Sequence, residues 1–140
     1  MFRKIMTPVD LTHQDQMQRA LQCSADLARH YGAPVVYVGV SATTPSAVAH
    51  TPAAFTEKLA AFAAGQASRH GVEASSLPKF RGDPATDVDD ALLEAAEETG
   101  ADLVVMASHI PNVLDHVWPS NGGKVAEYAA ASVLVVRTPA

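Results

Sequence analysis

The feature that most constrains this chain is a regular alternation of short apolar runs with segments of helical periodicity. The apolar runs predict strands at residues 2–9, 34–40, 74–81, 102–107 and 133–136. Apolar side chains at helical spacing predict helices at residues 13–31, 53–69, 84–99 and 121–131. This β-α-β pattern predicts an α/β fold, with a parallel sheet, right-handed crossovers and helices on both faces.

Several residues at the element boundaries support this assignment. Thr12 is a suitable N-cap for the first helix, and Gly32 follows that helix as a C-cap. Asp83 and Pro84 open the third helix, with aspartate at the cap and proline at the first helical position. Pro78 removes a backbone donor from the 74–81 strand, so we expect that strand at an edge of the sheet.

The size and composition predict one folded domain, residues 1–140. Hydrophobic residues make up 48% and charged residues 18% of the chain, which argues against disorder. The single cysteine, Cys23, cannot form an internal disulfide and is interpreted as a packing residue in the first helix. Because no apolar run approaches the roughly 18 to 20 residues that span a bilayer, we expect a soluble, cytoplasmic protein.

The charge distribution excludes one class of partner and constrains another. The net charge is −5, and there is no Lys or Arg between Arg81 and Lys124. Nucleic-acid binders carry a basic patch that neutralises phosphates, so we exclude that class. A phosphate site in this half of the chain would have to use backbone N–H groups and hydroxyls.

The predicted topology alone, without any sequence motif, indicates where a ligand would bind. Open parallel sheets bind ligands outside the carboxyl ends of their strands, where the strand order reverses. The residues at those ends form three segments, Pro8-Val9-Asp10, Gly39-Val40-Ser41 and Met106-Ala107-Ser108-His109. Gly122-Gly123-Lys124 lacks the upstream glycine and the following hydroxyl of a Walker loop, and is interpreted as the start of a helix. The site is therefore expected around residues 106–121.

Four segments spread along the whole chain form a recognisable pattern. They are Lys4-Ile5-Met6-Thr7-Pro8-Val9-Asp10, Gly82-Asp83-Pro84, Ala101-Asp102-Leu103-Val104-Val105-Met106-Ala107-Ser108-His109 and Ala131-Ser132-Val133-Leu134-Val135-Val136-Arg137. Together they resemble the universal stress protein family, and the Ala-Ser-His form is closest to a small proteobacterial subgroup. The resemblance implies a five-stranded, doubly wound parallel sheet of order 3-2-1-4-5, similar to the adenine nucleotide alpha hydrolases.

The resemblance also implies an adenine nucleotide as ligand, ATP or another, with Mg²⁺ only if ATP is bound. Asp10 and Val40 would then meet the adenine and ribose, beside Pro8 and Val9 at the end of the first strand. The other site residues implied are Met106, Ala107, His109 and Ile110 on the fourth-strand side, with Ser120 and Asn121 at the phosphates.

The chain departs from the ATP-binding branch of that family at every glycine of its loop. The branch has Gly-x₂-Gly-x₉-Gly-Ser/Thr, whereas this chain has Ala107, Ile110 and Pro119 at the three glycine positions. Glycine permits positive φ angles and a close approach of backbone to phosphate. Ile110 adds a branched side chain there, and Pro119 removes an N–H donor.

Other polar residues have simpler interpretations. Asp10 is either a ligand contact or the cap and turn residue after the first strand. His109 either contacts a ligand or bonds to backbone carbonyls. The acidic residues of the third helix are interpreted as a solvated face. The remaining histidines of the first half lack metal-ligand spacing and are interpreted as surface residues: His13, His30, His50 and His70.

Four functions remain open from the sequence. They are a non-enzymatic nucleotide-responsive stress protein, a slow ATPase, a dimeric interaction module without nucleotide, and a phosphoacceptor receiver domain. The receiver ranks low because the first strand ends in a single aspartate, Asp10, and the last ends at Arg137 rather than near a lysine. Family members commonly dimerise through the last strand, so we expect a homodimer paired through Val133–Val136. An efficient enzyme is not expected.

Overall fold

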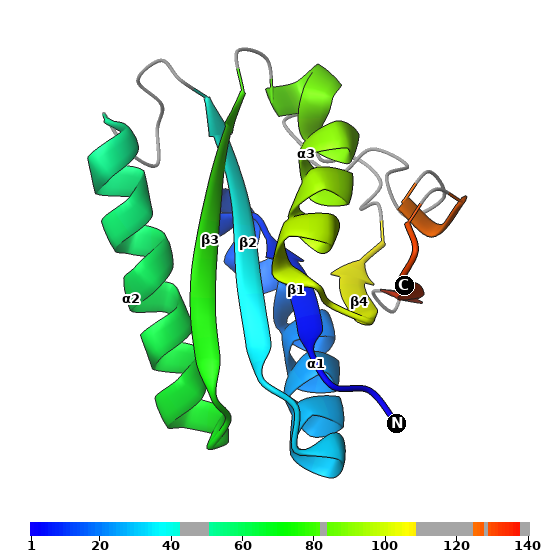
Figure 1. The fold of residues 1–140 in the computed structure, drawn as a ribbon. Coiled ribbons are helices and arrows are strands. Elements are labelled where there is room, and N and C mark those ends of the chain that lie inside the picture. The colour runs from blue at the N-terminus through cyan, green and yellow to red at the C-terminus, as the bar shows by residue number, and fades with distance from the viewer. Residues whose placement is uncertain (43–50, 82–83, 109–124, 128, 138–140) are drawn as a thin grey trace.

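The computed structural model describes residues 1–42, 51–81, 84–108, 125–127 and 129–137. The strands in these ranges form one parallel five-stranded sheet (Figure 1). The strand order is β3-β2-β1-β4-β5. The strands are β1 (Ile5–Val9), β2 (Val35–Ala42), β3 (Ala74–Arg81), β4 (Leu103–Ala107) and β5 (Ser132–Val136). The predicted fold class and the strand order 3-2-1-4-5 are therefore confirmed.

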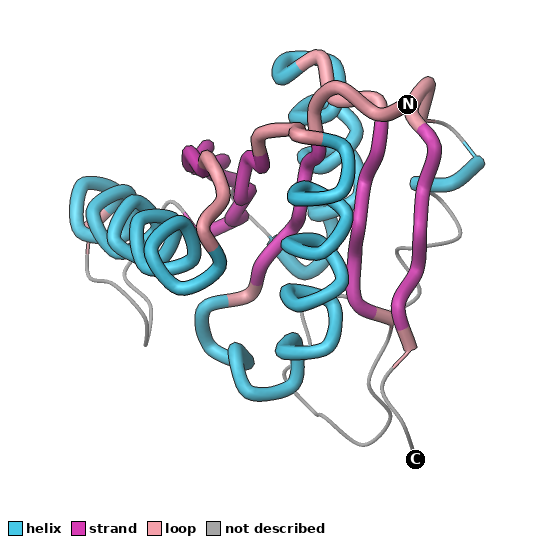
Figure 2. Tube along the Cα trace, turned by 90° about the horizontal axis from the view of Figure 1, so that it is seen from below, coloured by secondary structure: helices cyan, strands magenta, loops and turns pink. Residues whose placement is uncertain are grey.

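Helices cover both faces of this sheet, and their alternation with the strands can be followed in Figure 2. They are the 3-10 helix η1 (Leu11–Met17), α1 (Gln18–Tyr31), α2 (Pro52–His70) and α3 (Pro84–Thr99). In Figure 1, α3 crosses in front of the strands and α1 lies behind them. None of the helices within the described ranges is long and apolar enough to cross a membrane.

The register explains which helix covers which face. Thr7 of β1 pairs with Tyr37 of β2, so their side chains point to the same face. Thr7 bonds to Ser24 of α1, while the Tyr37 ring packs edge-on against Phe62 of α2. Hence α1 and α2 cover one face and α3 the other, as right-handed crossovers require.

The chain after β1 differs from the prediction of a single helix over 13–31. Asp10, not Thr12, caps the first segment, because the Asp10 side chain accepts a bond from the Thr12 N–H. His13 has non-helical backbone angles (φ −122°, ψ 39°), so the 3-10 segment η1 precedes α1. The end of α1 is as predicted, since Gly32 adopts the left-handed conformation (φ 64°) and donates its N–H to the Ala28 carbonyl.

Two further boundary differences lie toward the two ends of the chain. β1 begins at Ile5 rather than at residue 2, because the N–H groups of Arg3 and Lys4 donate to the Asp102 carboxylate. Within the predicted last helix, 121–131, residues 125–127 are helical and Val125 is fully buried, but Ala129–Ala131 are not helical. Residues 121–124 and 128 lie outside the described ranges.

The direction of the Pro78 backbone groups explains why proline is tolerated in β3. In a parallel strand, successive residues direct their N–H and C=O groups alternately to the two sides. The Glu73 carbonyl accepts the Val35 N–H, so residues 75, 77 and 79 face β2 and Pro78 faces away from it. The missing proline donor therefore costs no ladder bond, and the predicted edge position is confirmed.

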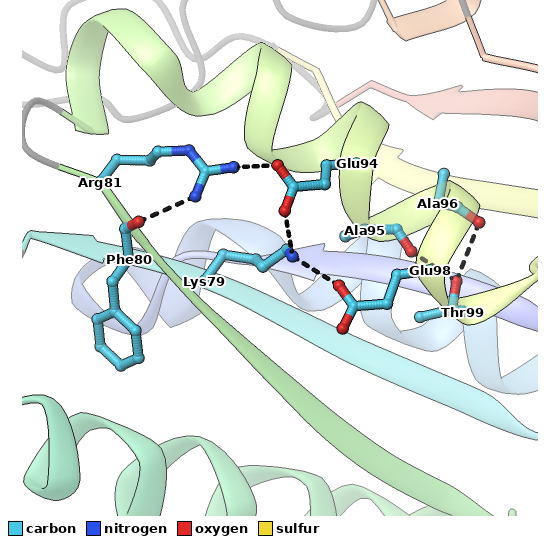
Figure 3. A network of polar contacts seen from close by, with 8 residues as sticks. All are labelled: Lys79, Phe80, Arg81, Glu94, Ala95, Ala96, Glu98 and Thr99. Atoms are coloured by element: carbon cyan, nitrogen blue, oxygen red, sulfur yellow. Dashed lines mark hydrogen bonds and ion pairs between the residues drawn. The ribbon is translucent and has the colours of Figure 1, made fainter.

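A polar network fastens α3 to β3 (Figure 3). The Lys79 ammonium, on a side chain only 11% exposed, donates to Glu94 Oε1 at 2.8 Å and to Glu98 Oε2 at 2.6 Å. Arg81 donates to the other oxygen of Glu94 at 2.5 Å. Glu94 and Glu98 are solvent-exposed, as expected for the acidic face of this helix, at 55% and 51%, and they also bind these cations, which the sequence did not indicate.

The buried bond between β1 and α1 provides a test of the packing. Thr7 Oγ1 and Ser24 Oγ lie 2.6 Å apart, and both residues are fully buried. Either Thr7→Val or Ser24→Ala leaves one hydroxyl buried without its partner, at a cost of about 1–3 kcal/mol. We expect the double variant to cost less than the sum of the two, by about 0.5–1.5 kcal/mol. Urea unfolding measures this coupling, and strict additivity would contradict it.

The α3–β3 network predicts a specific pH dependence. The hydrogen bond from Lys79, helped by the charges of Lys79 and Arg81, lowers the pKa of Glu94 from its usual 4.5. A lowered folded-state pKa stabilises the fold above the unfolded value, and the stabilisation is lost as pH falls through the folded value. Glu94→Gln should therefore lower the free energy of unfolding at neutral pH, and the difference from wild type should shrink below pH 4.5.

Glu97→Gln is the matched control for this prediction. Glu97 is an exposed glutamate of the same helix and makes no ion pair with any residue that the structure describes. Its substitution should leave the free energy of unfolding nearly unchanged at every pH. Equal effects of the two substitutions would show that the network does not stabilise the fold.

Candidate functional site

The carboxyl ends of β1, β2 and β4 lie at one edge of the sheet because the strands are parallel. Val9 pairs with Gly39, so Asp10, directly after β1, lies level with Val40 near the end of β2. On the other side of β1, β4 ends at Ala107 and is followed by Ser108. Apart from His109, which lies outside the described ranges, the three segments expected from the sequence thus lie at this edge.

The order of the strands reverses between β1 and β4. The chain runs from β1 outward to β2 and β3, then crosses to β4 and β5 on the other side of β1. This arrangement makes the carboxyl end between β1 and β4 the switch point, the position where sheets of this kind bind ligands.

Pro8 stops the pairing of β1 with β4 at this point. The Lys4 carbonyl accepts the Leu103 N–H, so Met6 and Pro8 also face β4. In a regular ladder the Pro8 nitrogen would donate to the Val105 carbonyl, but proline has no N–H. Within these described strands, the register accordingly ends at the Met6–Val104 pair, although β1 continues to Val9 and β4 to Ala107.

The predicted site residues of the strands are mostly core residues. Val9, Met106 and Ala107 are 2%, 1% and 5% exposed, and their side chains belong to the hydrophobic core. Pro8 is also buried, and Val40 is half-buried. These residues therefore have little besides backbone groups to offer a ligand. The other four predicted residues lie outside the described ranges: His109, Ile110, Ser120 and Asn121.

Asp10 is a buried polar residue, 7% exposed, at the end of the central strand. Its Oδ1 accepts the Thr12 N–H at 2.9 Å, and its Oδ2 lies 2.7 Å from His13 Nδ1. Its own N–H donates to the Met17 sulfur at 3.1 Å. Of the two interpretations of Asp10, the cap and turn role is thus observed, and the ligand contact stays a prediction.

His13 is the site residue that sequence reasoning missed. It was interpreted as a surface residue, but its side chain is only 18% exposed and is bound to Asp10. The contact engages Nδ1 of the ring, so Nε2 is the ring nitrogen that Asp10 leaves unengaged. No described residue binds Nε2. The available signal was the spacing, a histidine three residues after a strand-end aspartate.

The remaining features add little chemistry to this edge. Among the described residues, no group of three His, Cys, Asp or Glu side chains could hold a metal ion. Cys23 is half-buried in α1, and burial raises the pKa of its thiol, which fits a packing role. Two cavities lie elsewhere, one of about 310 Å³ beside α3 and Ala129–Ala131, and one of about 290 Å³ where α1 and α2 end.

Two solved structures share this fold over nearly their whole length. A universal stress protein in complex with cAMP has a TM-score of 0.69 and 18% identity, covering 99% of this chain and 98% of that one. The universal stress protein from Archaeoglobus fulgidus in complex with dAMP has a TM-score of 0.66 and 21% identity, covering 95% and 96%. At these identities the likeness establishes the fold.

The sequence comparisons identify the family. Universal stress protein G of Shigella flexneri is 46% identical over 50 residues, 36% of this chain, and the match spans only 35% of that relative. Residues 1–137 match the model of the Universal stress protein family, which is nearly the whole chain. The chain therefore belongs to the universal stress protein family.

Proposed function

We propose that this protein binds an adenine nucleotide at the switch point between β1 and β4 and acts as a cytoplasmic, homodimeric stress-response regulator rather than as an efficient enzyme. The observation that carries the proposal is the early end of the β1–β4 pairing at Pro8, beside Asp10. Two relatives of the same fold hold cAMP and dAMP, both adenine nucleotides.

The residues proposed to bind the nucleotide come from both sides of this switch point. Backbone groups of the buried strand ends would contact the base and ribose, since backbone N–H and C=O groups discriminate a base without a charged side chain. The residues proposed are Pro8, Val9, Asp10, Val40, Met106 and Ala107, with His109, Ile110, Ser120 and Asn121 from the segment outside the described ranges. Mg²⁺ would accompany the ligand only if it is ATP.

Slow ATP hydrolysis is the weaker alternative. Phosphoryl transfer relies on positioned cations, usually a lysine or arginine together with Mg²⁺ held by carboxylates. The sequence has no Lys or Arg between Arg81 and Lys124, the segment that holds the loop after β4. A regulator whose state depends on nucleotide occupancy needs binding alone, which fits this composition better.

The nucleotide proposal is tested by binding. Calorimetry with AMP, ADP and ATP-Mg should show saturable binding of at least one of them. The supernatant of heat-denatured protein should contain any nucleotide that is retained on purification. Asp10→Ala should weaken binding at least tenfold, because it removes the group that orders the residues after β1. It should also lower the free energy of unfolding by about 1 kcal/mol through the lost cap.

Asp26→Ala is the matched control. Asp26 is an exposed aspartate of α1 that pairs with Arg29, away from the carboxyl edge. Its substitution should leave affinity unchanged. If no nucleotide binds the wild-type protein, the proposal is wrong and the interaction module becomes the better interpretation. Equal losses from both substitutions would refute the placement of the site.

A homodimer through β5 is proposed from the backbone of that strand. The Ser132 N–H and the Val136 carbonyl bond to β4, so Val133 and Val135 direct their backbone groups away from β4. β5 is the last strand of the sheet, and Leu134 on it is 38% exposed. A second β5, related by a two-fold axis, would satisfy these edge groups.

If the protein dimerises through β5, a proline in the middle of that strand should abolish the dimer. Sedimentation equilibrium should give the mass of two 14.7-kDa chains for the wild type and one for Val135→Pro, which removes an outward donor. Ser76→Pro removes an equivalent outward donor from the other edge strand, β3, and should leave the dimer intact. Circular dichroism checks that both variants fold. A wild-type protein that stays monomeric at micromolar concentration would contradict the dimer.

A further inference from the structure

The outer edge of β5 restricts how two chains can pair in the proposed dimer. Val133 and Val135 direct their backbone groups outward, and two such residues that lie opposite each other in an antiparallel pair exchange both bonds. If Val133 lies opposite Val135 of the partner subunit, β5 overlaps its two-fold copy along its whole length. Leu134, which is 38% exposed, then lies on the axis against its own copy. An axis at either valine would leave the other valine opposite a residue outside β5.

This register brings the end of one β5 level with the start of the other. Arg137 directly follows β5 and Ala131 directly precedes it, each three residues from Leu134. With Leu134 on the axis, Arg137 of the partner subunit therefore lies opposite Ala131. Opposing residues of such a pair have Cα atoms about 5.5 Å apart, and their side chains share a face of the sheet.

The cavity of about 310 Å³ lies on the same face of the sheet as Ala131. Val133 is connected through Val104 of β4 to Met6 of β1, which neighbours Thr7. Thr7 faces α1, so alternation puts Val133, and Ala131 two residues before it, on the face of α3. The cavity is lined by Ala131 and by residues of α3, which include Ala96 and Glu97. An arginine opposite Ala131 would thus stand at the rim of this cavity.

The charges of the two groups are complementary. Glu97 and Arg137 are both exposed, and neither forms an ion pair with a residue in the described ranges. Arg137 is also the one Lys or Arg that the structure describes after Arg81. Each chain has a net charge of −5, so two chains repel each other over much of their surfaces. A cation at one end of β5 and a carboxylate near the other end favour the arrangement that brings them together.

We propose that Arg137 of the partner subunit lies over this cavity and forms an ion pair with Glu97, an inference that rests on the proposed β5 dimer. The stem of that arginine would pack on the apolar lining at Ala96 and Ala131 while its guanidinium stays in water beside the glutamate. The two-fold axis repeats the contact at both ends of the paired strands. The contact therefore fixes the register of β5 and favours a second copy of this chain over an edge strand without the arginine.

Exchanging the two charges tests this contact. Arg137→Glu and Glu97→Arg should each raise the dissociation constant of the dimer about tenfold, because two attractions per dimer become repulsions. The double variant restores both ion pairs with reversed signs and should return to within about threefold of the wild type. Sedimentation equilibrium measures the dissociation constants, and high salt should reduce the loss in each single variant. Circular dichroism checks folding, and glutamine at either position replaces a reversal variant that fails to fold.

Arg69→Glu and Glu57→Arg are the matched controls. Both residues are exposed on α2, which packs against β2 and β3 in the other half of the sheet. These substitutions change the net charge by the same amounts and should leave the dissociation constant nearly unchanged. Because the proposed contact joins two chains, Glu97→Arg should also leave the unfolding of a single chain nearly unchanged, which the monomeric Val135→Pro background measures.

The outcomes separate this inference from the dimer on which it rests. If the wild type dimerises and Val135→Pro does not, but both charge reversals dimerise like the wild type, the β5 dimer stands and the contact is refuted. Losses that the double variant does not recover, or that the controls share, would also refute the pairing of Arg137 with Glu97. If the wild type stays monomeric, the proposed dimer fails and this inference fails with it.

Discussion

The missing N–H group of Pro8 is the constraint on which the site depends. β1 is the central strand, buried along its whole length, and it bonds to β2 on one side and to β4 on the other. Proline at the fourth position of this strand removes the donor that would continue the ladder toward Val105. The two strands therefore end side by side without pairing, and Asp10 and His13 follow there. A single residue type thus separates the paired part of β1 from the end at which we propose the nucleotide site.

Contacts elsewhere in the fold hold the strands that end at this edge in place. The hydroxyls of Thr7 and Ser24 join β1 to α1 in the core, and the Lys79 network joins β3 to α3 on the other face. Gly39 lets α2 approach β2 closely, since a Cβ atom there would lie 2.8 Å from the Phe55 ring. Because helices are anchored on both faces, the strand ends can present backbone groups in a fixed arrangement. The recognition by backbone groups that we propose needs no cation, and the sequence has no Lys or Arg between Arg81 and Lys124.

Most of the fold could be predicted from the sequence because its signals are local. Periodicity gave the strands, Gly32 gave a helix end, and Pro78 gave an edge position. The errors have a common physical origin, which is that side-chain partners are set by tertiary structure. Asp10 displaced Thr12 as a cap, and two glutamates of the solvated face of α3 have a partner, Lys79, that the sequence did not indicate. The bond between His13 and Asp10 required a non-helical residue that no periodicity could indicate. For the candidate site, the topology predicted the strand ends but not the imidazole bound to Asp10.

The most direct measurement of the central claim is an NMR titration of ¹⁵N-labelled protein with AMP. If the switch point is the binding site, the amide resonances that shift should be those at the carboxyl ends of β1, β2 and β4, including Val9, Asp10, Val40, Ala107 and Ser108. The amides of Gly32 and Gly71, at the opposite end of the sheet, should stay in place. Shifts concentrated at Gly32 and Gly71, or no shifts at any amide, would contradict the account.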